Sequence, residues 1–254
     1  MRTKYREKKY ECGDFLEVLI YPVFQKQSGR RAKAKPTSEV QKKNNALNAE
    51  RQLTRLVHTN FTSGDYKLDL TYRTPPKDND EAVKDIQNFI RRAKRYYAAN
   101  GINEVKYIWV MEAGEKRGRL HFHLIITGGV DRTALEKLWG KGRANAYALQ
   151  FDENGVADLT HYMVKKPLMY RRWSGSKNLR KPKESQNDNK FSKKKVKELF
   201  ENPDSAGLFE QYYEGYYLSE CKPYHNDINQ GYYLFLRMRK KTASPPLAVR
   251  RKRG

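Results

Sequence analysis

The sequence has little cysteine, few acidic residues and no long apolar run. Only Cys12 and Cys221 occur among 254 residues, far apart and outside any Cys-x-x-Cys pattern. This excludes a disulfide framework or a cysteine-built zinc site, and it favours a reducing, intracellular setting. No apolar run approaches the roughly 20 residues that span a bilayer. The charged N-terminal residues lack the apolar segment of a secretory signal, so we expect a cytoplasmic protein.

The shortage of acids leaves a strong positive charge. Lysine and arginine number 52 against 29 aspartates and glutamates, which gives a formal net charge of +23. Such an imbalance points to a polyanionic partner, of which nucleic acid is the commonest. A membrane surface is the alternative, but the sequence offers no apolar segment to insert. The 18 tyrosines suit stacking on bases, although most of them are expected to serve packing.

The most informative stretch is a predicted β-hairpin. Residues 106–111 and 120–127 are rich in β-branched and aromatic side chains, and Gly114 and Gly118 bracket the polar connection between them. In a strand, successive side chains point to opposite faces. The apolar residues of the second strand therefore share one face, and the two histidines of the run His121-Phe122-His123 share the other.

A metal site follows from this hairpin. Glu112 ends the first strand, so pairing of the two strands places its carboxylate beside His121 and His123. Three such ligands bind a divalent ion and leave positions open for water or a substrate oxygen. The structural alternative is a half-exposed polar face without a ligand. A cupin requires a glutamate shortly after the histidine pair, which is absent here, and the HExxH pattern of zinc proteases is also absent.

The order of the remaining elements predicts an α+β fold. Apolar periodicity predicts helices over about 37–59, 78–100, 131–139, 158–166 and 192–201, and strands over 15–24, 66–72, 144–151 and 232–238. We expect an antiparallel sheet with helices on one face and the histidines on the other. Asp158 is the expected N-cap of its helix, and Pro22 suggests that its strand lies at an edge.

Changes in composition suggest four segments. Residues 1–59 form an N-terminal extension, 60–170 a central domain, 171–239 a basic linker with a helix and a last strand, and 240–254 a disordered basic tail.

A second constellation lies in the predicted helix 158–166. Tyr162 and Lys165 are three residues apart and share a helix face. A nearby cation favours the phenolate of a tyrosine, whose ordinary pKa is about 10. In a chain so rich in both residues, a tyrosine packed beside a solvated lysine is the simpler interpretation. After a His-x-His strand, however, the pair indicates a nuclease that forms a phosphotyrosine.

These motifs resemble the HUH endonucleases, the rolling-circle replication initiators of phages, plasmids and single-stranded DNA viruses. The resemblance rests on His121-Phe122-His123, on Tyr162-Met163-Val164-Lys165 and on the spacing of Glu112, and it covers about residues 60–170. Leu68–Thr71 loosely resembles the first strand motif of the family. Phage replication proteins of the filamentous-phage gene II type are the most similar group.

The resemblance implies a ferredoxin- or RRM-like palm with basic extensions and a divalent metal ion, Mg²⁺ or Mn²⁺, held by Glu112, His121 and His123. It also implies that Tyr162 attacks single-stranded DNA at a replication origin, giving a 5′-phosphotyrosine and a free 3′-OH, with Lys165 stabilising the phenolate or the phosphate. No second tyrosine lies three or four residues from Tyr162, which favours the single-tyrosine kind.

The expected partners and rival functions follow from the same comparison. The sequence lacks a GxxxxGK[ST] loop, so a host helicase and polymerase would act in trans within a bacterial cell. A transposase or a mobilisation relaxase shares this chemistry and differs in its DNA substrate. A non-catalytic RRM-like nucleic-acid-binding protein is the alternative from another class, but it would carry aromatic side chains where the histidines stand.

Overall fold

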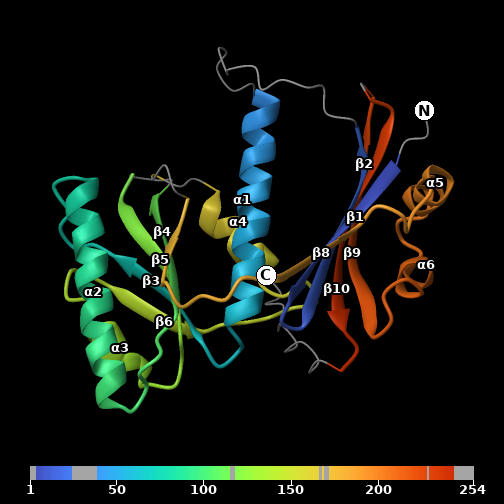
Figure 1. Ribbon diagram of the computed structural model, residues 1–254. Coiled ribbons are helices and arrows are strands. Elements are labelled where there is room, and N and C mark those ends of the chain that lie inside the picture. Colours follow the sequence, from blue (N-terminus) through green and yellow to red (C-terminus); the bar gives the residue numbers. More distant parts are fainter. Residues whose placement is uncertain are drawn as a thin grey trace, which may run out of the picture. The chain divides into compact units, whose positions relative to one another are not determined.

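The structure is a computed structural model that describes residues 4–24, 39–114, 118–165, 168, 172–227 and 229–242. The helices, labelled in Figure 1, are α1 (Glu39–Asn60), α2 (Asn79–Ala99), α3 (Arg132–Lys137), α4 (Ala157–Val164), α5 (Lys193–Glu201) and α6 (Ala206–Glu210). The strands are β1 (Lys4–Cys12), β2 (Phe15–Val23), β3 (Tyr66–Thr71), β4 (Tyr107–Ala113), β5 (Leu120–Ile126), β6 (Ala144–Ala148), β7 (Ser174–Gly175), β8 (Lys183–Asn187), β9 (Tyr216–Asn226) and β10 (Gly231–Lys240).

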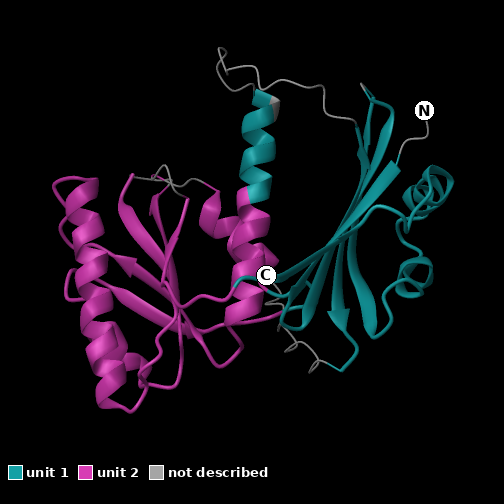
Figure 2. Cartoon of the chain, in the orientation of Figure 1, with its two compact units in different colours: residues 1–48, 152–155, 181–254 teal, residues 49–151, 156–180 magenta. Residues whose placement is uncertain are grey.

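The chain folds into two compact units, coloured separately in Figure 2. Unit 1 consists of residues 1–48, 152–155 and 181–254, and unit 2 of residues 49–151 and 156–180. Each unit contains a five-stranded sheet whose pairings are antiparallel. The predicted α+β class with antiparallel sheets is therefore confirmed. Among the described residues, no helix is both long and apolar enough to cross a membrane.

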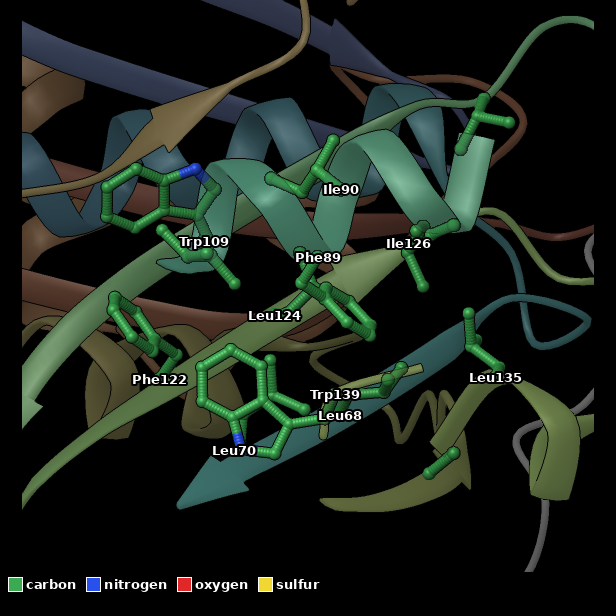
Figure 3. Packing of buried hydrophobic residues seen from close by; sticks show 14 of the residues in the cluster. Leu68, Leu70, Phe89, Ile90, Trp109, Phe122, Leu124, Ile126, Leu135 and Trp139 are labelled. Atoms are coloured by element: carbon green, nitrogen blue, oxygen red, sulfur yellow. The ribbon is translucent and has the colours of Figure 1, made fainter. Parts of the chain in front are cut away.

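The sheet of unit 2 has the order β6-β3-β5-β4-β7 and packs α2 and α3 on one face. The helix α2 begins where Asp78 accepts a hydrogen bond from the backbone N–H of Glu81 (2.7 Å). Its apolar residues recur at helical spacing and are buried. Figure 3 shows them against the strand residues in a core that includes Leu68, Leu70, Phe89, Ile90, Trp109, Phe122, Leu124, Ile126, Leu135 and Trp139.

Helices also cover part of the opposite face, which the sequence did not lead us to expect. A second apolar cluster joins Leu53 and Val57 of α1 and Met163 of α4 to Val110 and Ile125 of the sheet. The predicted N-cap of α4, Asp158, is wrong. The helix begins after Val156, whose backbone N–H donates to Nε2 of His58 (3.0 Å) in place of a side-chain cap.

The sheet of unit 1 has the order β8-β1-β2-β10-β9, with α5 and α6 packed against one of its faces. Strands from both ends of the sequence pair here, so sequence order separates flanks that backbone hydrogen bonds join. The predicted edge position of β2 is wrong, because β2 pairs with β1 on one side and β10 on the other. Pro22 is tolerated since the pairing with β10 ends at Ile20.

Residues 171–197, expected as a flexible linker, contain β7 and β8 and so are partly ordered in pairing with β4 and β1. Most of the expected basic tail and the basic stretch at residues 26–35 lie outside the described residues.

Candidate metal centre and active site

The antiparallel register of β4 and β5 brings the three predicted metal ligands together. Glu112 lies directly opposite His121 in the ladder, and His123 stands two residues further along β5 on the same face. The ladder between β3 and β5 places Asp69 directly opposite His123. Two strand pairings and the period of two thus set the positions of all four side chains.

The ligand atoms of these residues converge on one point. Nε2 of His121 lies 3.1 Å from Nε2 of His123. Oε2 of Glu112 lies 3.3 Å from Nε2 of His123 and 3.6 Å from Nε2 of His121. One ligand atom from each residue lies within 4.8 Å of the others. Glu112 and His123 are buried, and His121 is partly exposed, so the centre opens to solvent on the side of His121.

Hydrogen bonds at the other ring nitrogens orient both imidazoles. Nδ1 of His123 lies 2.6 Å from Oδ1 of Asp69, and Nδ1 of His121 lies 3.2 Å from the carbonyl oxygen of Arg119. A carboxylate and a carbonyl only accept, so each Nδ1 carries the proton and each Nε2 presents its lone pair to the centre. This arrangement is typical of metal-bound histidines, which usually donate their second N–H to a carboxylate or a carbonyl.

The donor set fits a cation. Oε2 of Glu112 is buried and has no hydrogen-bond partner. With both Nε2 atoms acting as acceptors, three acceptor atoms face one another without a proton donor between them. A buried acceptor left in this way costs about 1–3 kcal/mol, and more when it is charged. A divalent ion on Glu112, His121 and His123 would satisfy all three atoms at once.

Asp69 is a site residue that the sequence analysis missed. Burial alone would raise the pKa of its carboxyl group, but hydrogen bonds to His123 and to Lys67 outweigh that effect and lower the pKa. Nζ of Lys67 lies 2.9 Å from Oδ2 of Asp69. Asp69 therefore stays charged and fixes the tautomer of His123. The alternation of residues 66–72 was the available signal, since it places Asp69 on the polar face of its strand.

The structure also brings Tyr162 to the centre. Its ring centroid lies 5.2 Å from that of His123 in an edge-to-face arrangement, and 52% of the residue is exposed. The helix α4 is fixed beneath it by the buried Met163 and by the hydroxyl group of Thr160, 2.6 Å from that of Thr54 on α1. A rigid helix thus holds an accessible phenol against a metal ligand.

The neighbours of Tyr162 differ in their positions. Lys165 follows the last residue of α4, and its side chain is exposed. His161 points to another partner, since its Nδ1 lies 2.8 Å from Oε2 of Glu50. This agrees with the expectation that the residue beside the nucleophile lies around the helix from it.

Comparison with known proteins points to the same part of the chain. Residues 65–167 match the family model of the replication-associated protein of the ORF2 and gene II type. The matched stretch contains Asp69, all three predicted metal ligands, Tyr162 and Lys165. No curated protein and no solved structure matches the chain. The match supports a replication initiator family, and with it a role in replication that involves DNA.

Proposed function

We propose that this protein is a replication initiator of the HUH type, which nicks single-stranded DNA at an origin and reseals it. The observation that carries the proposal is the contact between Tyr162 and His123, a ligand of a centre with three converging acceptors. A nucleophile next to a phosphate-polarising ion is the arrangement that phosphoryl transfer to tyrosine needs. The match of residues 65–167 to a replication-associated family supports the same role.

The centre would bind one divalent ion, Mg²⁺ or Mn²⁺, through Glu112, His121 and His123. When bound, such an ion acts as a Lewis acid and offsets the negative charge that develops on a phosphate oxygen. Asp69 holds the imidazole of His123 in the orientation that this requires. The residues around the centre otherwise serve to position the DNA strand and the phenol.

The reaction exchanges one phosphodiester for another. The phenol oxygen of Tyr162 forms a bond to phosphorus, and the bond from phosphorus to the 3′-oxygen of the DNA breaks. The proton of the phenol passes through water to the departing 3′-oxygen, so the products are a 5′-phosphotyrosine and a free 3′-OH. Lys165 stabilises the phenolate or the phosphate. The reverse exchange reseals the strand without ATP, because the covalent link keeps the energy of the original bond.

The decisive test is a search for the covalent adduct. We expect the wild-type protein with Mn²⁺ to become linked to labelled single-stranded DNA from a randomised pool, and Tyr162→Phe to lose the adduct completely. This substitution removes only the hydroxyl group, so metal binding and circular dichroism should not change. Tyr170→Phe is the matched control, because Tyr170 is the nearest alternative nucleophile in the sequence, and it should retain the adduct.

Two outcomes would contradict this assignment. Mass spectrometry that finds the nucleotide on Tyr170, or an adduct that survives Tyr162→Phe, would place the nucleophile elsewhere. Binding of DNA with no adduct under any metal condition would favour a non-catalytic nucleic-acid-binding protein. Sequencing of the linked DNA separates an initiator from a transposase or a relaxase by the substrate that is selected.

A further inference from the structure

An open pocket of about 440 Å³ lies beside the metal centre on the same face of the sheet of unit 2. Its lining includes Lys67, Asp69, Tyr147 and Leu159. Small-molecule sites usually have volumes of about 300–1,000 Å³, so one nucleotide fits. Neither the metal centre nor the nucleophile accounts for this pocket.

The pocket is continuous with the active site through two elements. On β3, Lys67 and Asp69 share a face, and Asp69 contacts the metal ligand His123. On α4, Leu159 and Tyr162 are three residues apart and share a helix face. Two residues along a strand span about 7 Å, which corresponds to one or two nucleotides of a DNA strand.

Tyr147 gives the pocket a stacking surface. Its position opposite Lys67 in the ladder between β3 and β6 places both side chains on the face of the histidines. Nζ of Lys67 lies 5.8 Å from the centroid of the Tyr147 ring. Tyr147 is 49% exposed although it is a large aromatic residue. An exposed aromatic ring beside a cation is the combination with which proteins hold an unstacked base and its phosphate.

We infer that this pocket binds a base of the single-stranded DNA, one or two nucleotides from the scissile phosphate, by stacking on Tyr147. The inference rests on the proposed function and adds a binding subsite to it. Lys67 stands where it neutralises the adjacent phosphate, and Leu159 supplies an apolar wall. By holding one base, the pocket fixes the register of the strand relative to Tyr162.

The test combines binding with cross-linking in the full-length protein. The probe is a fluorescein-labelled 12-mer of thymidylate, measured by fluorescence anisotropy with Mn²⁺ at raised salt, where contacts to phosphates contribute less. A second copy of the 12-mer carries one 5-iododeoxyuridine, which forms photo-cross-links to aromatic side chains that stack on it.

We expect Tyr147→Ala to raise the Kd by about 5- to 150-fold, which is the effect of removing one stacked base. Tyr147→Phe should bind as the wild-type protein does, because the ring is retained. The matched control is Tyr224→Ala, since Tyr224 is also an exposed tyrosine on a strand but lies in unit 1. It should change the Kd by less than twofold, and the iodinated probe should label the peptide that contains Tyr147.

The outcomes separate the subsite from the proposed function. If Tyr147→Ala binds as tightly as the wild-type protein while both form the tyrosine adduct, the subsite is overturned and the nuclease function stands. If labelling falls on other tyrosines and spares Tyr147, the subsite is likewise overturned. A wild-type protein that neither binds the probe nor forms an adduct contradicts the proposed function and, with it, the subsite.

Discussion

At the scale of single residues, the two histidines differ in what holds their Nδ1 atoms. His123 is buried and faces a charged carboxylate, whereas His121 is partly exposed and faces a backbone carbonyl. A charge-assisted hydrogen bond is about twice as strong as a neutral one. His123 is therefore the more firmly oriented ligand, and His121 is the one that lies nearer to solvent and to an arriving substrate.

The first prediction concerns the ligands themselves. We expect the double variant His121→Ala/His123→Ala to lose Mn²⁺ binding in calorimetry and to lose the DNA adduct, because two of three ligands are removed. The fold should persist, since both side chains lie outside the main apolar core of unit 2. His225→Ala, which alters a histidine of unit 1, is the control and should bind Mn²⁺ normally. Unchanged Mn²⁺ binding in the double variant would refute the metal site.

The second prediction concerns Asp69, which touches the centre only through His123. Asp69→Asn retains the shape of the side chain but removes the charge that fixes the Nδ1–H tautomer. Loss of such an outer partner typically weakens metal affinity by about 10- to 100-fold. Asp131→Asn, at the N-cap of α3, is the control and should leave metal affinity unchanged. If Asp69→Asn binds Mn²⁺ as the wild-type protein does, Asp69 has no positioning role.

At the scale of elements, the sequence predicts the hairpin well because its signals are local. Alternation along β5, the glycines of the connection and the position of Glu112 are all contained in residues 107–127. Asp69 required knowledge of which strand pairs with β5 on its other side, and that pairing joins residues more than 50 positions apart. The packing of α1 on the histidine face is equally non-local, so neither feature could be predicted from a single window.

Glycines at the end of the histidine strand set how closely two turns approach. A Cβ atom at Gly128 would lie 1.8 Å from the carbonyl oxygen of Gly64, and the backbone N–H of Gly128 donates to Asp65 (2.8 Å). The third prediction is that Gly128→Ala lowers the free energy of unfolding by about 1–3 kcal/mol or more, because the backbone must shift. Urea denaturation followed by circular dichroism measures this change.

The control for that variant is Gly207→Ala. Gly207 lies in α6, has no atom within 4 Å of its added Cβ, and should gain rather than lose stability, because alanine favours a helix. Equal stability of Gly128→Ala and the wild-type protein would show that the two turns separate at little cost.

At the scale of the whole molecule, the distribution of function differs from the distribution of sequence. The matched stretch of residues 65–167 holds the proposed chemistry, whereas the flanks on both sides supply the sheet of unit 1. β1 was not predicted because its charged sequence shows weak alternation. Its pairing to β2 hides Glu7, which binds Nζ of Lys190 (2.6 Å) and the hydroxyl group of Tyr213 (2.7 Å). Such pairing of distant charges leaves no local signal in the sequence.

The last prediction concerns the net charge of +23, which far exceeds what one active site requires. Residues 243–254 include four basic residues, Arg250, Arg251, Lys252 and Arg253, and no acid. Each basic side chain that neutralises a phosphate of single-stranded DNA releases counterions and contributes about 0.7 to the slope of log K against log salt. Truncation after Thr242 leaves β10 whole and should reduce this slope by up to about 3, while the adduct still forms.

A full-length variant with these four residues changed to glutamine separates charge from chain length. It should reproduce the smaller slope, because counterion release depends on charge alone. Anisotropy titrations of the thymidylate 12-mer at several salt concentrations measure all three proteins. If the truncated protein and the wild-type protein give the same slope, the tail does not contact DNA. If truncation lowers the slope but the glutamine variant does not, the tail acts through something other than its charge.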